Sequence, residues 1–190
     1  MKRVFITGAS SGLGLALARE FASQGAQLGL LARRQNALSE LIASLPNAQS
    51  HRAYAVDVND HAALAAAASD FIAHTGGIDV VIANAGISYG TLTERPADLA
   101  VFEKIMQTNL LATVATFSPF ITTMKSQAAA GERGMRLVGI ASVAGIRGLP
   151  GAEAYSASKA AVISYCESLR VALRRHAIEV VTIAPGYIDT

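Results

Sequence analysis

A tyrosine and a lysine four residues apart, Tyr155 and Lys159, could together move a proton. In a helix this spacing puts both side chains on one face, one turn apart. A phenol is a poor base near neutral pH. An ammonium about 4 Å away would favour the phenolate by about 4 kcal/mol at an effective dielectric constant of 20. Pairs with this spacing also occur on solvated helix faces, so the assignment needs further residues.

Ser142 is a candidate partner for this pair. It directly follows the apolar run 137–141, which is typical of a buried strand. A hydroxyl at the end of a strand could bond a substrate oxygen and hold it for proton transfer. Tyr155, Lys159 and Ser142 therefore suggest acid–base chemistry on an oxygen-bearing carbon.

A glycine-rich segment lies between the first apolar run and the first helical pattern. Its glycines allow a sharp turn and close approach to a ligand, and the following helix offers free N–H groups to a phosphate. Its spacing, G-x-x-x-G-x-G, departs from the G-x-G-x-x-G fingerprint of dinucleotide sites. The position nevertheless predicts a phosphate-binding loop built from Gly8, Ser10, Ser11, Gly12, Leu13 and Gly14.

Two other interpretations of this segment have less support from the sequence. Gly8 to Gly12 matches the G-x-S-x-G motif of hydrolases, with Ser10 as nucleophile. That motif belongs above a sheet built from earlier strands, and here only one short strand precedes it. A P-loop needs a lysine after its last glycine, whereas Leu15 follows Gly14.

Arg33 and Arg34 end the second apolar run, where NAD-specific sites carry an acidic residue that binds the ribose 2′-hydroxyl. A guanidinium instead pairs with a 2′-phosphate. The sequence therefore favours NADP(H) over NAD(H). The alternative is that both arginines are a solvated helix start.

Strand and helix patterns alternate along the chain, which predicts an α/β fold. Alternation of this kind gives right-handed crossovers and a doubly wound parallel sheet with helices on both faces and strand order 3-2-1-4-5-6. Residues 1–190 read as a single Rossmann-type domain. The expected strands are 4–7, 27–32, 52–56, 79–83, 137–141 and 179–184, and the expected helices 13–23, 36–45, 62–74, 99–125 and 154–176.

Taken together, these motifs resemble the short-chain dehydrogenase/reductase family over nearly the whole chain. The resemblance implies that Tyr155 is the general acid/base, that Lys159 assists it and binds the nicotinamide ribose, and that Ser142 orients the substrate. Asn109 would complete a tetrad by holding a water for a proton relay. The residues that carry the resemblance are Thr7-Gly8-x-x-x-Gly12-x-Gly14, Asn84-Ala85-Gly86, Asn109, Ser142, Tyr155-x-x-x-Lys159 and Pro185-Gly186.

The resemblance also implies the remaining cofactor contacts and the reaction. Asp57 and Val58 would contact adenine, Asn84, Ala85 and Gly86 would run along the cofactor, and a C-terminal segment would contact the nicotinamide carboxamide. Hydride would pass between nicotinamide and a carbonyl or alcohol, with reduction as the expected direction and a homodimer or homotetramer as the assembly. The nicotinamide-contacting residues would be Pro185, Gly186, Ile188 and Thr190.

Family members usually continue with another strand and a helical substrate lid, whereas this chain stops at Thr190. We therefore expect the lid to be absent or truncated. This leaves open a second function: a dinucleotide-binding regulator or scaffold without turnover.

Composition bounds the other possibilities. A formal net charge of +2 gives no support to nucleic-acid binding. No apolar run approaches the ~20 residues of a membrane span, and no signal-peptide core follows Met1, so the cytoplasm is the expected compartment. The single cysteine cannot form an internal disulfide, and the four histidines have no metal-ligand spacing. We expect a small-molecule substrate and no metal.

Overall fold

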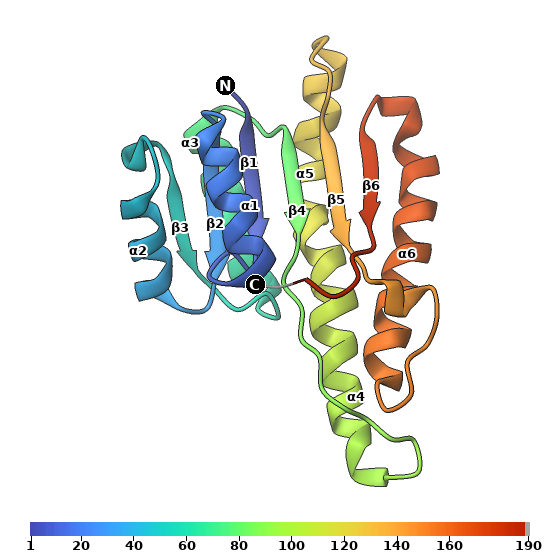
Figure 1. Cartoon of the computed structure of the whole chain (residues 1–190). Helices are drawn as coiled ribbons and strands as arrows, with labels where there is room; N and C mark the ends of the chain where they lie inside the picture. Colours follow the sequence, from blue (N-terminus) through green and yellow to red (C-terminus); the bar gives the residue numbers. More distant parts are fainter. Residues whose placement is uncertain (189–190) are drawn as a thin grey trace.

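The computed structural model describes residues 1–188, and their strands form one parallel sheet (Figure 1). The strand order is β3-β2-β1-β4-β5-β6, which confirms the predicted order 3-2-1-4-5-6. It reverses between β1 and β4, the position where such sheets bind ligands. The strands are β1 (Arg3–Thr7), β2 (Gln27–Ala32), β3 (Arg52–Ala55), β4 (Val80–Ala83), β5 (Arg136–Ile140) and β6 (Glu179–Ile183).

Helices cover the sheet in two groups. Side chains alternate between the two faces of a strand, so Val4 and Ile6 pack toward α1 (Gly12–Ser23) and α2 (Gln35–Ser44). Phe5 points the other way, toward α3, α5 and α6. These helices are α3 (His61–Thr75), α5 (Ala112–Ala129) and α6 (Glu153–Leu173). The C-terminal ends of the strands, at the lower edge of the sheet in Figure 1, remain uncovered by this packing.

One predicted helix differs from expectation. The sequence predicts a continuous helix over 99–125, but the structure has α4 (Leu99–Met106), a π-helical turn (Gln107–Leu111) and then α5. A π turn has one residue more than an α turn and occurs frequently at functional sites. Asn109 lies inside this turn and is 1% exposed.

Candidate active site

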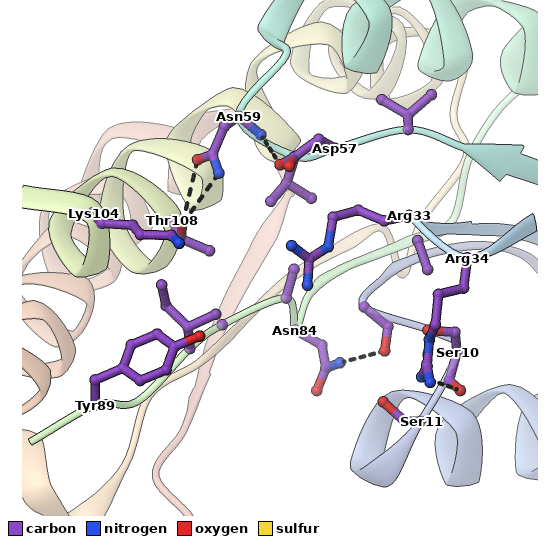
Figure 2. Close-up of a pocket in the computed structure, with 17 residues that line it drawn as sticks. Ser10, Ser11, Arg33, Arg34, Asp57, Asn59, Asn84, Tyr89, Lys104 and Thr108 are labelled. Carbon is purple, nitrogen blue, oxygen red and sulfur yellow. Dashed lines mark hydrogen bonds between the residues drawn. The ribbon is translucent and has the colours of Figure 1, made fainter. Parts of the chain in front are cut away.

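A cleft of about 440 Å³ opens at the switch point of the sheet (Figure 2). The ends of β1, β2, β3 and β4 form its floor, and the π-helical turn with the end of α4 forms one wall. It is lined by Gly8, Ser10, Ser11, Ala32, Arg33, Arg34, Val56, Asp57, Val58, Asn59, Asn84, Ala85, Gly86, Ile87, Tyr89, Lys104 and Thr108.

Hydrogen bonds from Thr7 and Asn84 hold the floor of the cleft together. The Thr7 hydroxyl accepts from the backbone N–H groups of Asn84 (3.1 Å) and Ala85 (3.2 Å) and donates to the Ile82 carbonyl (3.4 Å). The Asn84 amide donates to the carbonyls of Thr7 (3.0 Å) and Gly8 (3.3 Å). The ends of β1 and β4 are therefore fixed to each other at the point where a ligand would enter.

The glycine segment fits a bound pyrophosphate. Gly8 and Gly12 have positive φ angles, and a Cβ on Gly14 would collide with the Gly8 carbonyl and the Asn84 amide. The N-cap residue of α1, Ser11, makes no side-chain capping bond. The Ser11 side chain thus leaves the first N–H groups of α1 available to an anion, as an anion site at a helix N-terminus requires.

Arg33 and Arg34 reach the cleft in different ways (Figure 2). The Arg34 guanidinium donates to the carbonyl (3.1 Å) and the hydroxyl (3.2 Å) of Ser10. The Arg33 guanidinium projects into the cleft, and within residues 1–188 it forms no salt bridge. Arg33 is therefore the guanidinium that is free to meet an anion.

Several residues of the cleft were not predicted from the sequence. The Asn59 amide donates to the Thr108 hydroxyl (3.2 Å), and the Asp57 carboxylate accepts from the Asn59 N–H (2.9 Å). These bonds join the segment after β3 to the π-helical turn. Lys104, one turn before Thr108, lies 6.0 Å from the Tyr89 ring centre. No short motif marks such residues, because tertiary packing brings them together across about fifty positions.

The Lys159 ammonium lies at the meeting point of α6, β5 and the cleft wall. It donates to the Ile140 carbonyl (2.8 Å) and lies 5.7 Å from the ring centre of Tyr155. It also flanks Gly86, since a Cβ there would lie 3.5 Å from Nζ. Burial lowers the pKa of Lys159 to about 8, which leaves the ammonium largely protonated at neutral pH.

Lys159→Met is expected to stabilise the protein at pH 7, by up to about 3 kcal/mol. The pKa of Lys159 falls from 10.5 to about 8 on burial, so the folded chain carries a disfavoured charge below pH 8. This penalty shrinks as the pH rises above 8 and vanishes near 10.5. Urea unfolding at pH 7 and pH 10 measures the difference.

Lys125→Met, at an exposed position, is the control and should change the stability by less than about 0.5 kcal/mol. An equal effect of Lys159→Met at both pH values would contradict this account.

The Asn109 side chain joins the cleft wall to α6. Its amide oxygen accepts from the Ile87 N–H (2.8 Å), and its NH₂ group donates to the Ile87 carbonyl and the Ser158 hydroxyl (2.9 Å each). The structure thus brings Asn109 next to Lys159 and Gly86. Its water-holding role stays a prediction.

Ser142 begins the turn that follows β5, and this turn packs on α6. Its hydroxyl accepts from the Ala144 N–H (3.1 Å), and the side chain is 8% exposed. A Cβ on Gly145 would lie 2.6 Å from the Lys159 carbonyl carbon, so the turn lies directly against the backbone of α6. The four predicted catalytic residues are therefore gathered at one edge of the sheet.

The C-terminal segment also reaches this edge. The Val143 N–H donates to the Pro185 carbonyl (3.0 Å), which places Pro185 and Gly186 beside the Ser142 turn. Ile188 is 47% exposed. The predicted contact of Thr190 lies outside the described residues.

The fold and cleft define a Rossmann-type protein with a nucleotide-binding site beside a Tyr–Lys pair. Comparison with known sequences then identifies the family, because the profile of the short chain dehydrogenases matches residues 2–190. The chain belongs to this family of oxidoreductases. The cofactors of the family are nicotinamide dinucleotides, and the cradle that Gly8, Gly12 and Gly14 form in this chain fits such a group.

Relatives agree with this assignment. Dehydrogenase/reductase SDR family member 7B of Bos taurus is 40% identical over 195 residues, which cover 98% of this chain and 58% of the relative. An uncharacterized oxidoreductase of Mycobacterium tuberculosis is 40% identical over 193 residues, which cover 100% of this chain and 74% of the relative. The chain thus spans little more than half of the bovine protein.

Solved structures agree on the fold. An NAD⁺-bound xylitol dehydrogenase superposes with a TM-score of 0.89 at 29% identity, over 100% of this chain and 71% of that one. A 3-ketoacyl-(acyl-carrier-protein) reductase from Brucella melitensis, complexed with NADH, superposes with a TM-score of 0.89 at 27% identity. The match covers 97% of this chain and 75% of that one. Both neighbours hold NAD-type dinucleotides.

Residues 1–188 contain neither a membrane-spanning helix nor a cluster of metal-binding side chains. None of their helices has the length and apolar character needed to cross a membrane. Nor do these residues contain a group of three or more His, Cys, Asp or Glu side chains placed to bind a metal ion.

Proposed function

We propose that this chain catalyses NADP(H)-dependent interconversion of a carbonyl and an alcohol. One observation carries the proposal: the Lys159 ammonium lies near both the Tyr155 ring, 5.7 Å from its centre, and Gly86, which lines the cleft. A proton-transferring group and a cofactor site are thereby adjacent, as hydride transfer to a carbonyl requires.

The cofactor would bind along the floor of the cleft and supply or accept the hydride. The N–H groups at the start of α1 would hold the pyrophosphate, Asp57 and Val58 the adenine, and Pro185, Gly186 and Ile188 the carboxamide side. Arg33 favours NADP(H), because its guanidinium reaches into the cleft and has no carboxylate partner among the described residues, whereas a carboxylate there would repel a 2′-phosphate.

The catalytic work of the chain is to orient the substrate and deliver a proton. Tyr155 would donate the proton to the carbonyl oxygen during reduction and take it back during oxidation. The Lys159 ammonium would favour the phenolate through its positive charge. The Ser142 hydroxyl accepts one bond, from Ala144, and keeps its own proton for the substrate oxygen.

The proposal extends to the whole protein. The substrate would be a small ketone or secondary alcohol, the assembly a homodimer or homotetramer, and the compartment the cytoplasm. A relative from Arachis hypogaea, 36% identical, is an 11-beta-hydroxysteroid dehydrogenase, and the xylitol enzyme is a structural neighbour. The first points to apolar ketones and the second to polyols, so a test needs both.

The full-length protein, mixed with NADPH and then with NADH, should oxidise NADPH in the presence of at least one ketone of a panel. The panel includes phenanthrenequinone, a steroid ketone and a ketose, and the decay of the reduced-nicotinamide absorbance measures turnover. NADPH binding without oxidation by any compound would instead support a regulator without turnover. If Ser10 were a nucleophile, a serine-directed phosphonate would label it. We expect no labelling, since the Arg34 guanidinium donates a hydrogen bond to the Ser10 hydroxyl.

A further inference from the structure

Ser158 is a fully buried hydroxyl in the second turn of α6, between Tyr155 and Lys159 along the chain. Its Oγ donates to the Tyr155 carbonyl (2.7 Å) and lies 2.9 Å from the Asn109 amide nitrogen. In an α-helix the same Tyr155 carbonyl also accepts the N–H of Lys159, four residues on. Ser158 therefore bonds the same carbonyl that links the backbone positions of Tyr155 and Lys159.

The direction of these hydrogen bonds is fixed. The Asn109 amide must point its oxygen at the Ile87 N–H and its nitrogen at the Ile87 carbonyl. The flipped amide would place two donors against each other and two acceptors against each other. The nitrogen can only donate, so Ser158 must accept from it. The single hydroxyl proton of Ser158 is then directed at the Tyr155 carbonyl.

The other end of this chain of bonds is the dinucleotide cleft. Ile87 lines the cleft, and both of its backbone polar groups bond Asn109. The links run from Ile87 through Asn109 and Ser158 to Tyr155, and all four bonds measure between 2.7 and 2.9 Å. These bonds thus connect the cleft residue Ile87 to the helix turn that carries the phenol.

We propose that Ser158 is a positioning residue that sets the orientation of the Tyr155 phenol according to the position of the cleft wall. The inference rests on the proposed function only in taking Tyr155 as the proton donor. Ser158 is fully buried and does not line the cleft, so its effect would pass through the Tyr155 backbone. Loss of the hydroxyl leaves one of the two N–H groups of the buried Asn109 amide without an acceptor, while the other still bonds the Ile87 carbonyl, so the bridge opens at Ser158.

The test records ¹⁹F NMR spectra of the full-length protein labelled with 3-fluorotyrosine, with the Tyr155 resonance assigned by its loss in Tyr155→Phe. We expect Ser158→Ala to shift or broaden this resonance and to reduce its response to added NADPH. The matched control is Thr116→Val, which removes another buried hydroxyl whose one bond within residues 1–188 is to the Ala112 carbonyl of its own helix. It should leave the resonance unchanged. A Tyr155 resonance identical to wild type in Ser158→Ala, with and without NADPH, overturns the proposal.

Kinetics with phenanthrenequinone give a second readout. Ser158→Ala should lower kcat about ten-fold and leave the KM for NADPH within about two-fold, as expected for a misplaced reacting group. Ser158→Cys, which keeps a weak acceptor and donor, should recover part of the loss. It also replaces the alanine variant in the NMR test if that variant does not fold. A parallel fall of kcat and rise of KM without a change in the resonance would show a merely structural role. If the wild type lacks turnover, the proposed function fails, and the resonance alone still decides on Ser158.

Discussion

Tyr155→Phe is expected to lower turnover at least about a thousand-fold, because it removes the proton that the phenol would deliver to the substrate oxygen in the proposed reaction. The ring remains, so its packing against the Lys159 ammonium persists. NADPH affinity should stay within about two-fold of wild type. Reduced-nicotinamide absorbance measures the turnover, and the enhancement of NADPH fluorescence measures the binding.

The matched control for this result is Tyr165→Phe. Tyr165 lies on the same helix, and its ring stacks on Phe117 at 6.3 Å, away from the cleft. Loss of its hydroxyl should leave kcat unchanged. Turnover that survives in Tyr155→Phe would assign the proton donor to another group.

Arg33→Asp should reduce the preference for NADPH over NADH at least about a hundred-fold, which corresponds to about 3 kcal/mol. The change removes the free guanidinium in the cleft and adds a carboxylate that repels a 2′-phosphate while accepting from a 2′-hydroxyl. The ratio of kcat/KM for the two cofactors, measured with one ketone, gives the result.

Arg19→Asp makes the same change of net charge at an exposed position of α1 outside the cleft, and should leave the ratio within about two-fold. Arg34→Asp separates the two neighbours, since Arg34 already bonds Ser10. A ratio that responds to Arg34→Asp alone would move the phosphate contact to that residue. An unchanged ratio in all three variants would remove the preference for NADP(H).

The sheet was predictable from the sequence because buried parallel strands are continuous apolar runs, and the runs of this chain alternate with helical patterns. The strand order followed from handedness rules, and the glycine segment located the switch point. The expected strands agree with the observed ones to within one residue at each end.

The π-helical turn was not predicted, because the tertiary contacts of Asn109 with Ile87 and Ser158 favour it over a regular turn. The sequence carries no local mark of the turn, and the residues on either side of it form ordinary α-helix, α4 before it and α5 after it.

The candidate site divides in the same way. Tyr155, Lys159 and the glycines were found from local spacing. The hydrogen bond from Lys159 to the Ile140 carbonyl could not be found from local spacing, because it joins helix α6 to strand β5. Asn59, Lys104 and Thr108 were missed for the same reason: their place in the cleft is set by how the π-helical turn that follows α4 meets the segment after β3.

The three hydrogen bonds of the Thr7 hydroxyl use its one donor and both of its acceptor positions, and they join the two strands on which a dinucleotide would rest. This part of the cleft is preorganised. A ligand arriving there meets backbone groups that already have their final arrangement, so association loses little conformational entropy in the protein. The affinity should accordingly depend on the ligand's own flexibility and desolvation more than on ordering of the receptor.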